Sequence, residues 1–306
     1  MESDKGAVSS VATQTRRSLW LDALRHLLEK RSAVVGLSML IGLAAIAILA
    51  PALATHDPIQ PLSDIKRNTP PCIRLLGCPD SQPQHIFGID GNNRDFFSRM
   101  LYGARLSLII GFATVSLALT VGTLLGAVSG YLGGWIDNVI MRIMDVMLAF
   151  PFLLLAIFLV AVLGPGLINA LLAISIVSIP GYARIARASV VSVKEMDYVT
   201  ADRALGVSPA RILFRRILPN AMTPLIVQGT LGIGTAIISA AALSFLGLGA
   251  QPPTPEWGIM LAEERNNLFN APHLLFIPGV AITLTVLGFN LLGDGLRDAL
   301  DPRLNR

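Results

Sequence analysis

The sequence predicts an all-α integral membrane protein with six transmembrane helices, and three observations lead to this fold class. Hydrophobic residues make up 53% of the 306 positions and charged residues only 14%, about half the charged share of a typical soluble domain. The apolar residues gather into runs that approach the ~20 residues a helix needs to cross a bilayer. Most of the 24 basic residues lie beside alternate ends of these runs, as the positive-inside rule requires. The net charge of +4 therefore indicates membrane orientation rather than nucleic-acid binding.

The N-terminal third is expected to hold one span and one external segment. The first apolar run starts near Ala33, after several basic residues, and is long enough to span, so it indicates a retained helix and not a cleaved signal. The tail before it includes an amphipathic stretch at 19–28. The predicted division is a cytoplasmic tail, a first transmembrane helix, an extracytoplasmic segment, a five-helix core and a second cytoplasmic tail, at 1–32, 33–54, 55–102, 103–298 and 299–306.

The second span is predicted at about 106–128 and carries three glycines at four-residue intervals. Gly122, Gly126 and Gly130 fall on one stripe of the helix, where the missing side chains allow another helix to come close. We therefore expect this stripe to pack against a neighbouring helix.

Proline and glycine punctuate the four remaining spans. The third is expected to begin near residue 139 and to kink at Pro151. The fourth and sixth are expected to be interrupted at Pro180 and Pro278. The last three spans are predicted at 167–186, 225–246 and 274–292, with a short helix in an external loop at 248–273.

A polar, basic stretch at 192–224 interrupts the apolar spans and predicts a helix–turn–helix. A capping-box pattern predicts a helix from Ser192 that stops at Gly206, in the left-handed conformation. A Ser-Pro pair predicts that a second helix starts at Pro209 and ends before Pro219. An ordinary basic connector between two spans would share this composition, so the residues alone leave both interpretations open.

Within that bend, Ala201, Gly206 and the Leu218–Pro219 pair have the spacing of a known motif. They resemble the EAA loop of the membrane subunits of ABC importers, whose consensus is Glu-Ala-Ala, three residues, Gly, nine residues, Ile-x-Leu-Pro. This sequence departs from the consensus at three positions, Thr200, Asp202 and Arg216. The resemblance implies a coupling loop that contacts an ATPase subunit through Tyr198, Ala201, Asp202, Arg203, Ala204, Leu205, Gly206 and Pro219.

A second signature precedes the second span. It resembles the segment Phe-Gly-Thr-Asp-x-x-Gly-Arg-Asp of the dipeptide, oligopeptide and nickel permeases, with matches at Phe87, Gly88, Asp90, Arg94 and Asp95. The alternative from the residues alone is a capped surface helix in which Asp95 pairs with Arg99. Residues 243–260 also look like this permease family.

Together the signatures identify the chain as a member of the peptide/nickel-type ABC importer permeases, with the type I permease fold. The resemblance implies one half of a pore in the bacterial inner membrane, with both termini cytoplasmic. Its implied partners are a second homologous permease, two ABC ATPase subunits that carry ATP and Mg, an extracytoplasmic substrate-binding protein and the lipid bilayer. Di- and oligopeptides are the expected cargo, with nickel complexes, glutathione or opines as alternatives.

Several kinds of chemistry are not expected in this chain. No GxxxxGK[ST] pattern occurs, so no ATP site, and no catalytic residue, cofactor or metal-ligand cluster is expected. Cys72 and Cys78 leave two alternatives open, a disulfide or two free thiols. No residue is assigned to substrate. A stand-alone channel or secondary carrier is the alternative of another class, and mid-span charges or an inverted repeat would favour it.

Overall fold

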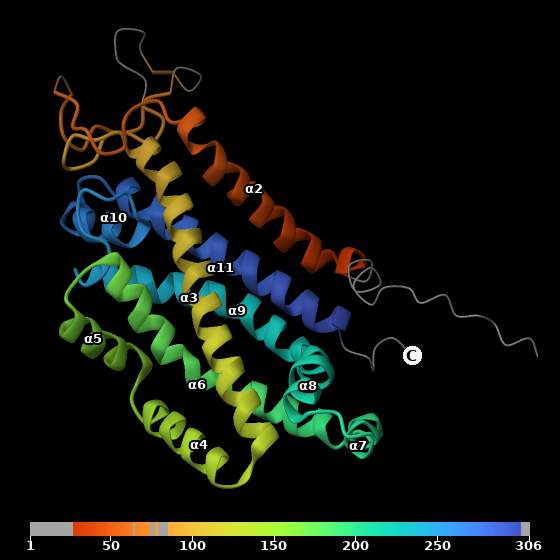
Figure 1. The fold of residues 1–306 in the computed structure, drawn as a ribbon. Helices are drawn as coiled ribbons and strands as arrows, with labels where there is room; N and C mark the ends of the chain where they lie inside the picture. Colours follow the sequence, from red (N-terminus) through yellow and green to blue (C-terminus); the bar gives the residue numbers. More distant parts are fainter. Residues whose placement is uncertain (1–26, 64, 74–76, 79–84, 301–306) are drawn as a thin grey trace, which may run out of the picture.

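The structure is a computed structural model that describes residues 27–63, 65–73, 77–78 and 85–300. Most of the amphipathic stretch at 19–28 and most of the second cytoplasmic tail lie outside the described residues. The described part contains helices and two isolated β-bridges but no strand (Figure 1). The elements are α2 (Arg31–Leu53), α3 (Phe96–Leu132), α4 (Gly134–Leu148), α5 (Phe152–Leu163), α6 (Leu167–Lys194), α7 (Asp197–Ala204), α8 (Pro209–Ile212), η2 (Leu213–Ile217), α9 (Leu218–Phe245), α10 (Trp257–Glu264), η3 (Arg265–Asn267) and α11 (His273–Leu300).

Among the described residues, five stretches of helix are long and apolar enough to cross a membrane: α2, α3, α6, the run from α8 through α9, and α11. The third expected span is broken into α4 and α5, which meet at an angle of 94°. Pro151 lies at this break as the residue before α5, where its missing N–H costs no helical hydrogen bond. The six expected spans are therefore five unbroken helices and one bent pair.

Several helices are longer than the sequence predicted. α3 begins at Phe96, ten residues before the expected start, because the Asp95 side chain caps it by accepting a hydrogen bond from the Ser98 backbone N–H. The expected interruptions at Pro180 and Pro278 are wrong, since α6 and α11 run through them. Both prolines are buried against neighbouring helices, and such packing offsets the single hydrogen bond that each proline removes.

Two predicted helix ends in the basic stretch are also wrong. α6 does not stop before Ser192 but continues to Lys194, because Val190 and Val193 keep it packed in the core, and no side-chain cap starts α7. The second helix does not end before Pro219. Instead α8, a turn of π-helix (η2) and α9 follow one another without a break, and Pro219 falls in the first turn of α9, where its missing N–H matters least.

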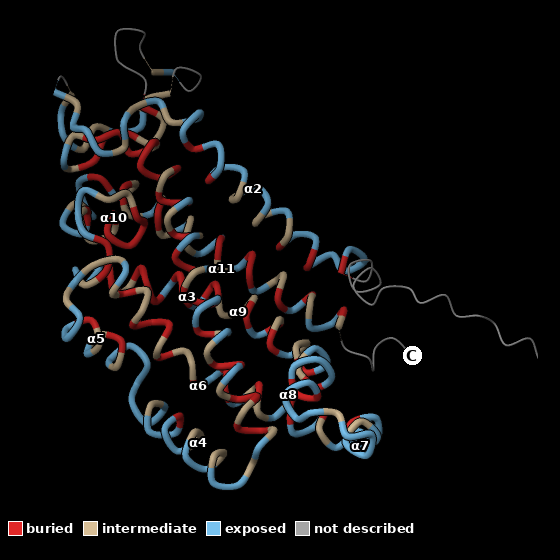
Figure 2. Tube along the Cα trace, in the orientation of Figure 1, coloured by how far each residue is buried: buried red, intermediate tan, exposed pale blue. Residues whose placement is uncertain are grey.

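α3 is the central helix, and its most extensive contact is with α6 (Figure 1). The stripe formed by Gly122, Gly126 and Gly130 lies against α6 of the same chain, so close that a Cβ atom at any of them would strike α6. The stripe therefore allows packing within the subunit, not contact with a partner. Figure 2 shows the buried positions concentrated on α3, α6 and α9, while α2, α4 and α7 are largely exposed.

The two ends of the helix bundle differ in what they carry. α7, α8, the start of α2 and the end of α11 gather at one end (Figure 1), where Lys30 pairs with Asp298 at 3.5 Å. The segment between α2 and α3 and the helix α10 form the other end. Both ends of the described chain thus lie on the side of the basic bend.

Candidate functional site

The tip of the basic bend is a short helix closed by glycine. Gly206 follows α7 with φ of +74°, the left-handed conformation expected for it. The Val207 N–H donates to the Asp202 carbonyl and the Gly206 N–H to the Arg203 carbonyl, which is the hydrogen-bond pattern of a Schellman motif. A β-branched residue at this φ would be strained, so the turn depends on glycine.

α7 projects from the bundle but is fastened to the helices behind it. Val199 is its one buried residue and packs with the ends of α3 and α6 and with η2. The Tyr198 hydroxyl accepts a hydrogen bond from the Asn220 side chain at 3.0 Å, and the Asp202 carboxylate pairs with Arg216 at 3.1 Å. Side-chain contacts therefore tie α7 to η2 and to the start of α9.

The Asp202–Arg216 pair joins two of the three positions at which the sequence departs from the EAA consensus. Each departure alone would place a charge where the consensus has an apolar residue. Together they form an ion pair between α7 and η2, which the sequence analysis did not foresee. An acidic and a basic residue at two positions that differ from the same consensus are the signal that could have indicated this ion pair.

The outward face of α7 is formed by the predicted coupling residues. Ala201, Arg203, Ala204 and Leu205 are exposed, and the Leu205 side chain is 80% exposed. An exposed leucine among small side chains at the tip of a protruding helix suits insertion into an apolar cleft. Pro219 is apart from this face, at the start of α9.

The second signature forms a buried ionic network at the opposite end. The Arg94 guanidinium donates to Asp90 at 2.7 Å and to Glu263 of α10 at 2.8 Å. The Arg99 guanidinium donates to the same Glu263 carboxylate at 2.9 Å. Two guanidinium groups and two carboxylates balance one another, so the network joins the segment before α3 to α10 without a net buried charge.

The Asp95–Arg99 pair of the alternative interpretation does not form between these described side chains, because Asp95 caps α3 while Arg99 pairs with Glu263 of α10. Gly88 has φ of +80° and lies against the Thr69 carbonyl, and Phe87 packs edge-on against Phe97 with ring centroids 5.2 Å apart. Glu263 was not predicted from the sequence, although two adjacent acidic residues in a short apolar helix are a signal for it. Burial raises the pKa of its neighbour, the Glu264 carboxyl, which accepts from the Gly91 N–H.

The two cysteines lie in the same segment. Cys72 and Cys78 are joined by a disulfide with their Cα atoms 5.2 Å apart, so the structure contains the first of the two open alternatives.

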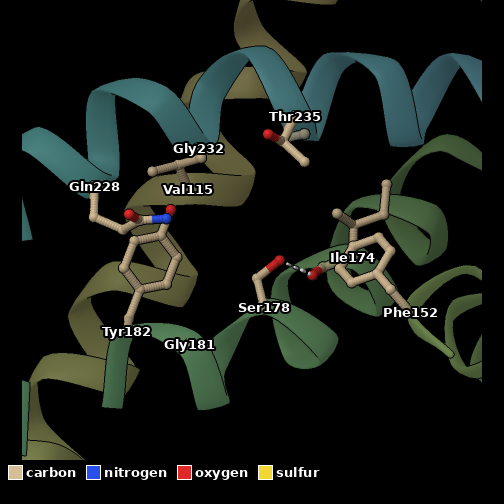
Figure 3. Close-up of a pocket in the computed structure, with 10 residues that line it drawn as sticks. Val115, Phe152, Ile174, Ser178, Gly181, Tyr182, Gln228, Gly232 and Thr235 are labelled. Carbon is tan, nitrogen blue, oxygen red and sulfur yellow. Dashed lines mark hydrogen bonds between the residues drawn. The ribbon is translucent and has the colours of Figure 1, made fainter. Parts of the chain in front are cut away.

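A pocket of about 130 Å³, lined by both apolar and polar side chains, lies between α3, α5, α6 and α9 (Figure 3). Tyr182 of α6 points toward α9, where its hydroxyl lies close to Gly232, and Gln228 lines the same pocket. Ser178 donates to the Ile174 carbonyl, and Thr235 lies across the pocket from it. The sequence analysis named no substrate residue, although long polar side chains inside the spans, such as Gln228, were a signal for this pocket.

The chain is similar to known transport proteins over most of its length. Residues 122–306 match the family described as binding-protein-dependent transport system inner membrane component, and residues 18–71 match the N-terminal TM domain of oligopeptide transport permease C. The dipeptide transport system permease protein DppC of Alkalihalophilus pseudofirmus is 50% identical over 95% of this chain and 92% of that protein.

Two further comparisons extend this result. The glutathione transport system permease protein GsiD of Pectobacterium atrosepticum is 45% identical over 94% of this chain and 92% of that protein. A solved structure, an inward-facing conformation of the MetNI methionine ABC transporter, matches with a TM-score of 0.56 at 18% identity. It covers 66% of this chain and 97% of that chain, and at this identity it supports the fold alone.

Proposed function

The chain belongs to the family of binding-protein-dependent transport system inner membrane components, and we propose that it is a pore subunit of an ATP-driven ABC importer for short peptides. The observation that carries the peptide assignment is the 50% identity to a dipeptide permease over almost the whole chain. Glutathione, itself a small peptide, is the second candidate because a glutathione permease is 45% identical over a similar length. The chain is a multi-pass protein of the inner membrane.

A pore subunit of this kind needs partners for energy and for capture of the solute. We propose a second homologous permease, two ATPase subunits that carry ATP and Mg, and an extracytoplasmic substrate-binding protein. Nucleotide-driven closure of the ATPase pair would push on α7, and its ties to η2 and α9 would carry that motion into the spans. This arrangement supports alternating access in place of a stand-alone channel or carrier.

Reconstitution tests the proposal. Proteoliposomes that contain this chain with its partner permease and ATPase pair should accumulate a labelled dipeptide only when ATP and the loaded binding protein are both present. Omission of this chain should abolish the accumulation. Uptake that continues without ATP, or that is driven by an ion gradient, would favour a secondary carrier and overturn the assignment.

The orientation in the membrane is tested by thiol labelling. We expect α7 and both termini to face the cytoplasm and the segment between α2 and α3 to face outward, because the basic residues gather at the α7 end. Ser208→Cys should resist a membrane-impermeant thiol reagent in intact cells, and Ser63→Cys should react with it. The native cysteines are bonded to each other and do not interfere. Labelling of Ser208→Cys from outside would show that the chain has the opposite orientation in the membrane.

The pocket in Figure 3 is proposed as part of the translocation path. Its volume of about 130 Å³ is below the ~300 Å³ of a typical small-molecule site, so this conformation is too narrow for a dipeptide. Its polar groups, Ser178, Tyr182, Gln228 and Thr235, could exchange hydrogen bonds with a peptide backbone once α6 and α9 separate. The partner permease would supply the opposite wall.

A paired substitution tests the importance of the α6–α9 contact. A Cβ atom at Gly232 would overlap the Tyr182 hydroxyl, while its next neighbours, Tyr182 Cζ at 3.4 Å and Val115 Cγ2 at 3.6 Å, are at ordinary distances. We expect Gly232→Ala to lower uptake about tenfold, since overpacking costs ~1–3 kcal/mol. Addition of Tyr182→Phe removes the overlapping hydroxyl oxygen and should restore uptake.

Uptake is measured with the assembled transporter, after normalisation to the amount of complex. Tyr182→Phe alone is the control, and a large loss in that variant would assign the hydroxyl itself a role in transport. Normal uptake by the Gly232→Ala variant would show that the contact between α6 and α9 does not limit the transport cycle.

A further inference from the structure

Three side chains that can bind a metal ion meet where the segment between α2 and α3 is closed. His56 follows α2, His85 precedes the second signature and Asp95 caps α3, and their candidate ligand atoms all lie within 4.8 Å of one another. The Asp95 Oδ1 atom is 3.1 Å from His85 Nδ1 and 3.8 Å from His56 Nδ1. We propose that these residues bind one divalent transition-metal cation, with Zn²⁺ as the probe ion.

The distances suit a single ion between the three groups. Zn²⁺ holds imidazole nitrogen and carboxylate oxygen at ~2.0–2.2 Å, so two ligand atoms at a tetrahedral ion are roughly 3.3 Å apart. The two distances from Oδ1 lie on either side of this value. The ligand nitrogens of the two histidines lie within 4.8 Å of each other, so rotation of the histidine side chains would bring all three ligand atoms to a single ion.

The Asp95 carboxylate is already oriented for this role. Its Oδ2 atom accepts hydrogen bonds from the Ser98 N–H, the Ser98 hydroxyl and the Thr55 hydroxyl, at 2.8, 2.7 and 3.3 Å. Oδ1 is left to face the two histidines. Metal-binding carboxylates are held by outer hydrogen bonds of this kind, which fix the ligand before the ion arrives.

Burial and charge at the cluster also favour a cation. The Asp95 side chain is 0% exposed, and among the described residues no Lys or Arg pairs with it, since Arg94 and Arg99 are engaged by Asp90 and Glu263. A buried carboxylate needs compensating positive charge, of which the N-terminus of α3 supplies only part.

The histidines differ in a way that suits entry of a hydrated ion. The His85 side chain is 1% exposed, and its Nε2 atom is buried without a hydrogen-bond partner among the described residues. Within the described part of the chain, the one hydrogen bond of this side chain is therefore the contact of Nδ1 with Asp95. The His56 side chain is 34% exposed and leaves a route for the ion and for a water molecule as fourth ligand. Imidazole with carboxylate favours zinc, copper or nickel over magnesium or calcium.

The site would join the end of α2, the segment before the second signature and the start of α3. No metal-ligand cluster was expected from the sequence, because neither cysteine has a nearby histidine and four ligands could not be assembled, whereas the fold brings two histidines and an aspartate together. The inference does not depend on the transport assignment, because ion binding is measured on the chain itself.

Binding is measured on the full chain, purified with a tag that contains no histidine, stripped with a chelator and titrated with Zn²⁺ alone. We expect one equivalent of zinc and a rise in the melting temperature. His56→Gln and His85→Gln should each lower zinc affinity at least tenfold. His273→Gln should leave the zinc affinity unchanged, because His273 lies outside the cluster. It is a matched control, since its Nε2 atom, like that of His85, is buried without a hydrogen-bond partner among the described residues. Co²⁺ in place of zinc should give visible absorption bands that His56→Gln abolishes.

The proposal is overturned if the chain binds no stoichiometric zinc, or if the His56→Gln variant binds it as the wild type does. The His56 side chain is 34% exposed and that of His85 only 1%, so His56→Gln disturbs the fold less and decides the result. Asp95→Asn is not used, since it also alters the cap of α3.

Discussion

We expect Gly126→Leu to prevent folding of the chain, and not only its assembly with partner subunits. A Cβ atom at Gly126 would overlap the Ala183 carbonyl oxygen and lie 2.7 Å from Ala186 Cβ and 2.9 Å from the Arg187 backbone nitrogen. Two of these atoms belong to the backbone of α6, so no side-chain rotation relieves the overlap. Overpacking of this kind costs ~1–3 kcal/mol even where neighbours can adjust, and here the whole helix must move.

The measurement is the yield and thermal stability of the full chain in detergent, by size-exclusion chromatography and unfolding of the purified fraction. Gly279→Leu in α11 is the matched control, because a Cβ atom at Gly279 has nothing within 4 Å. Gly126→Ala should give an intermediate loss. Normal yield and stability of Gly126→Leu would mean that α3 and α6 are farther apart than in this structure.

Gly206→Val is expected to abolish transport while the spans still insert. A Cβ atom at Gly206 meets nothing within 4 Å, so the substitution creates no clash and acts through the backbone alone. At φ of +74° a β-branched residue is disfavoured by roughly 1–2 kcal/mol or more, enough to distort the turn that orients α7. Gly206→Asn is the control, because asparagine tolerates this conformation and should keep most of the activity.

Ala201→Arg tests the same surface without touching the turn. Ala201 is exposed, so the larger side chain should leave folding unchanged but prevent the close fit of α7 in a cleft of an ATPase subunit. Each variant is compared with the wild type by pull-down of the ATPase pair and by substrate uptake, and we expect at least a tenfold loss of both. If docking of the ATPase pair and substrate uptake are unchanged in both Gly206→Val and Ala201→Arg, the bend is an ordinary basic connector between two spans.

What the sequence determined by itself was the class of protein, its family and the local turns. Composition and apolar runs predicted the helical membrane fold, and the signatures predicted the permease family. Both predictions were possible because the apolar runs and the signatures consist of residues close together along the chain. Gly206 was predicted in the left-handed conformation for the same reason, since a helix end followed by glycine is a local pattern.

Only the tertiary structure decided where the helices on either side of α7 begin and end, and which charges pair. α6 runs past Ser192 because Val190 and Val193 remain packed in the core, and packing outweighs the weak local preference of a capping box. Likewise Arg99 pairs with Glu263 of α10, and His56 meets His85 and Asp95, through contacts between segments far apart in the chain. Such pairings depend on the relative placement of whole helices, which no local pattern specifies.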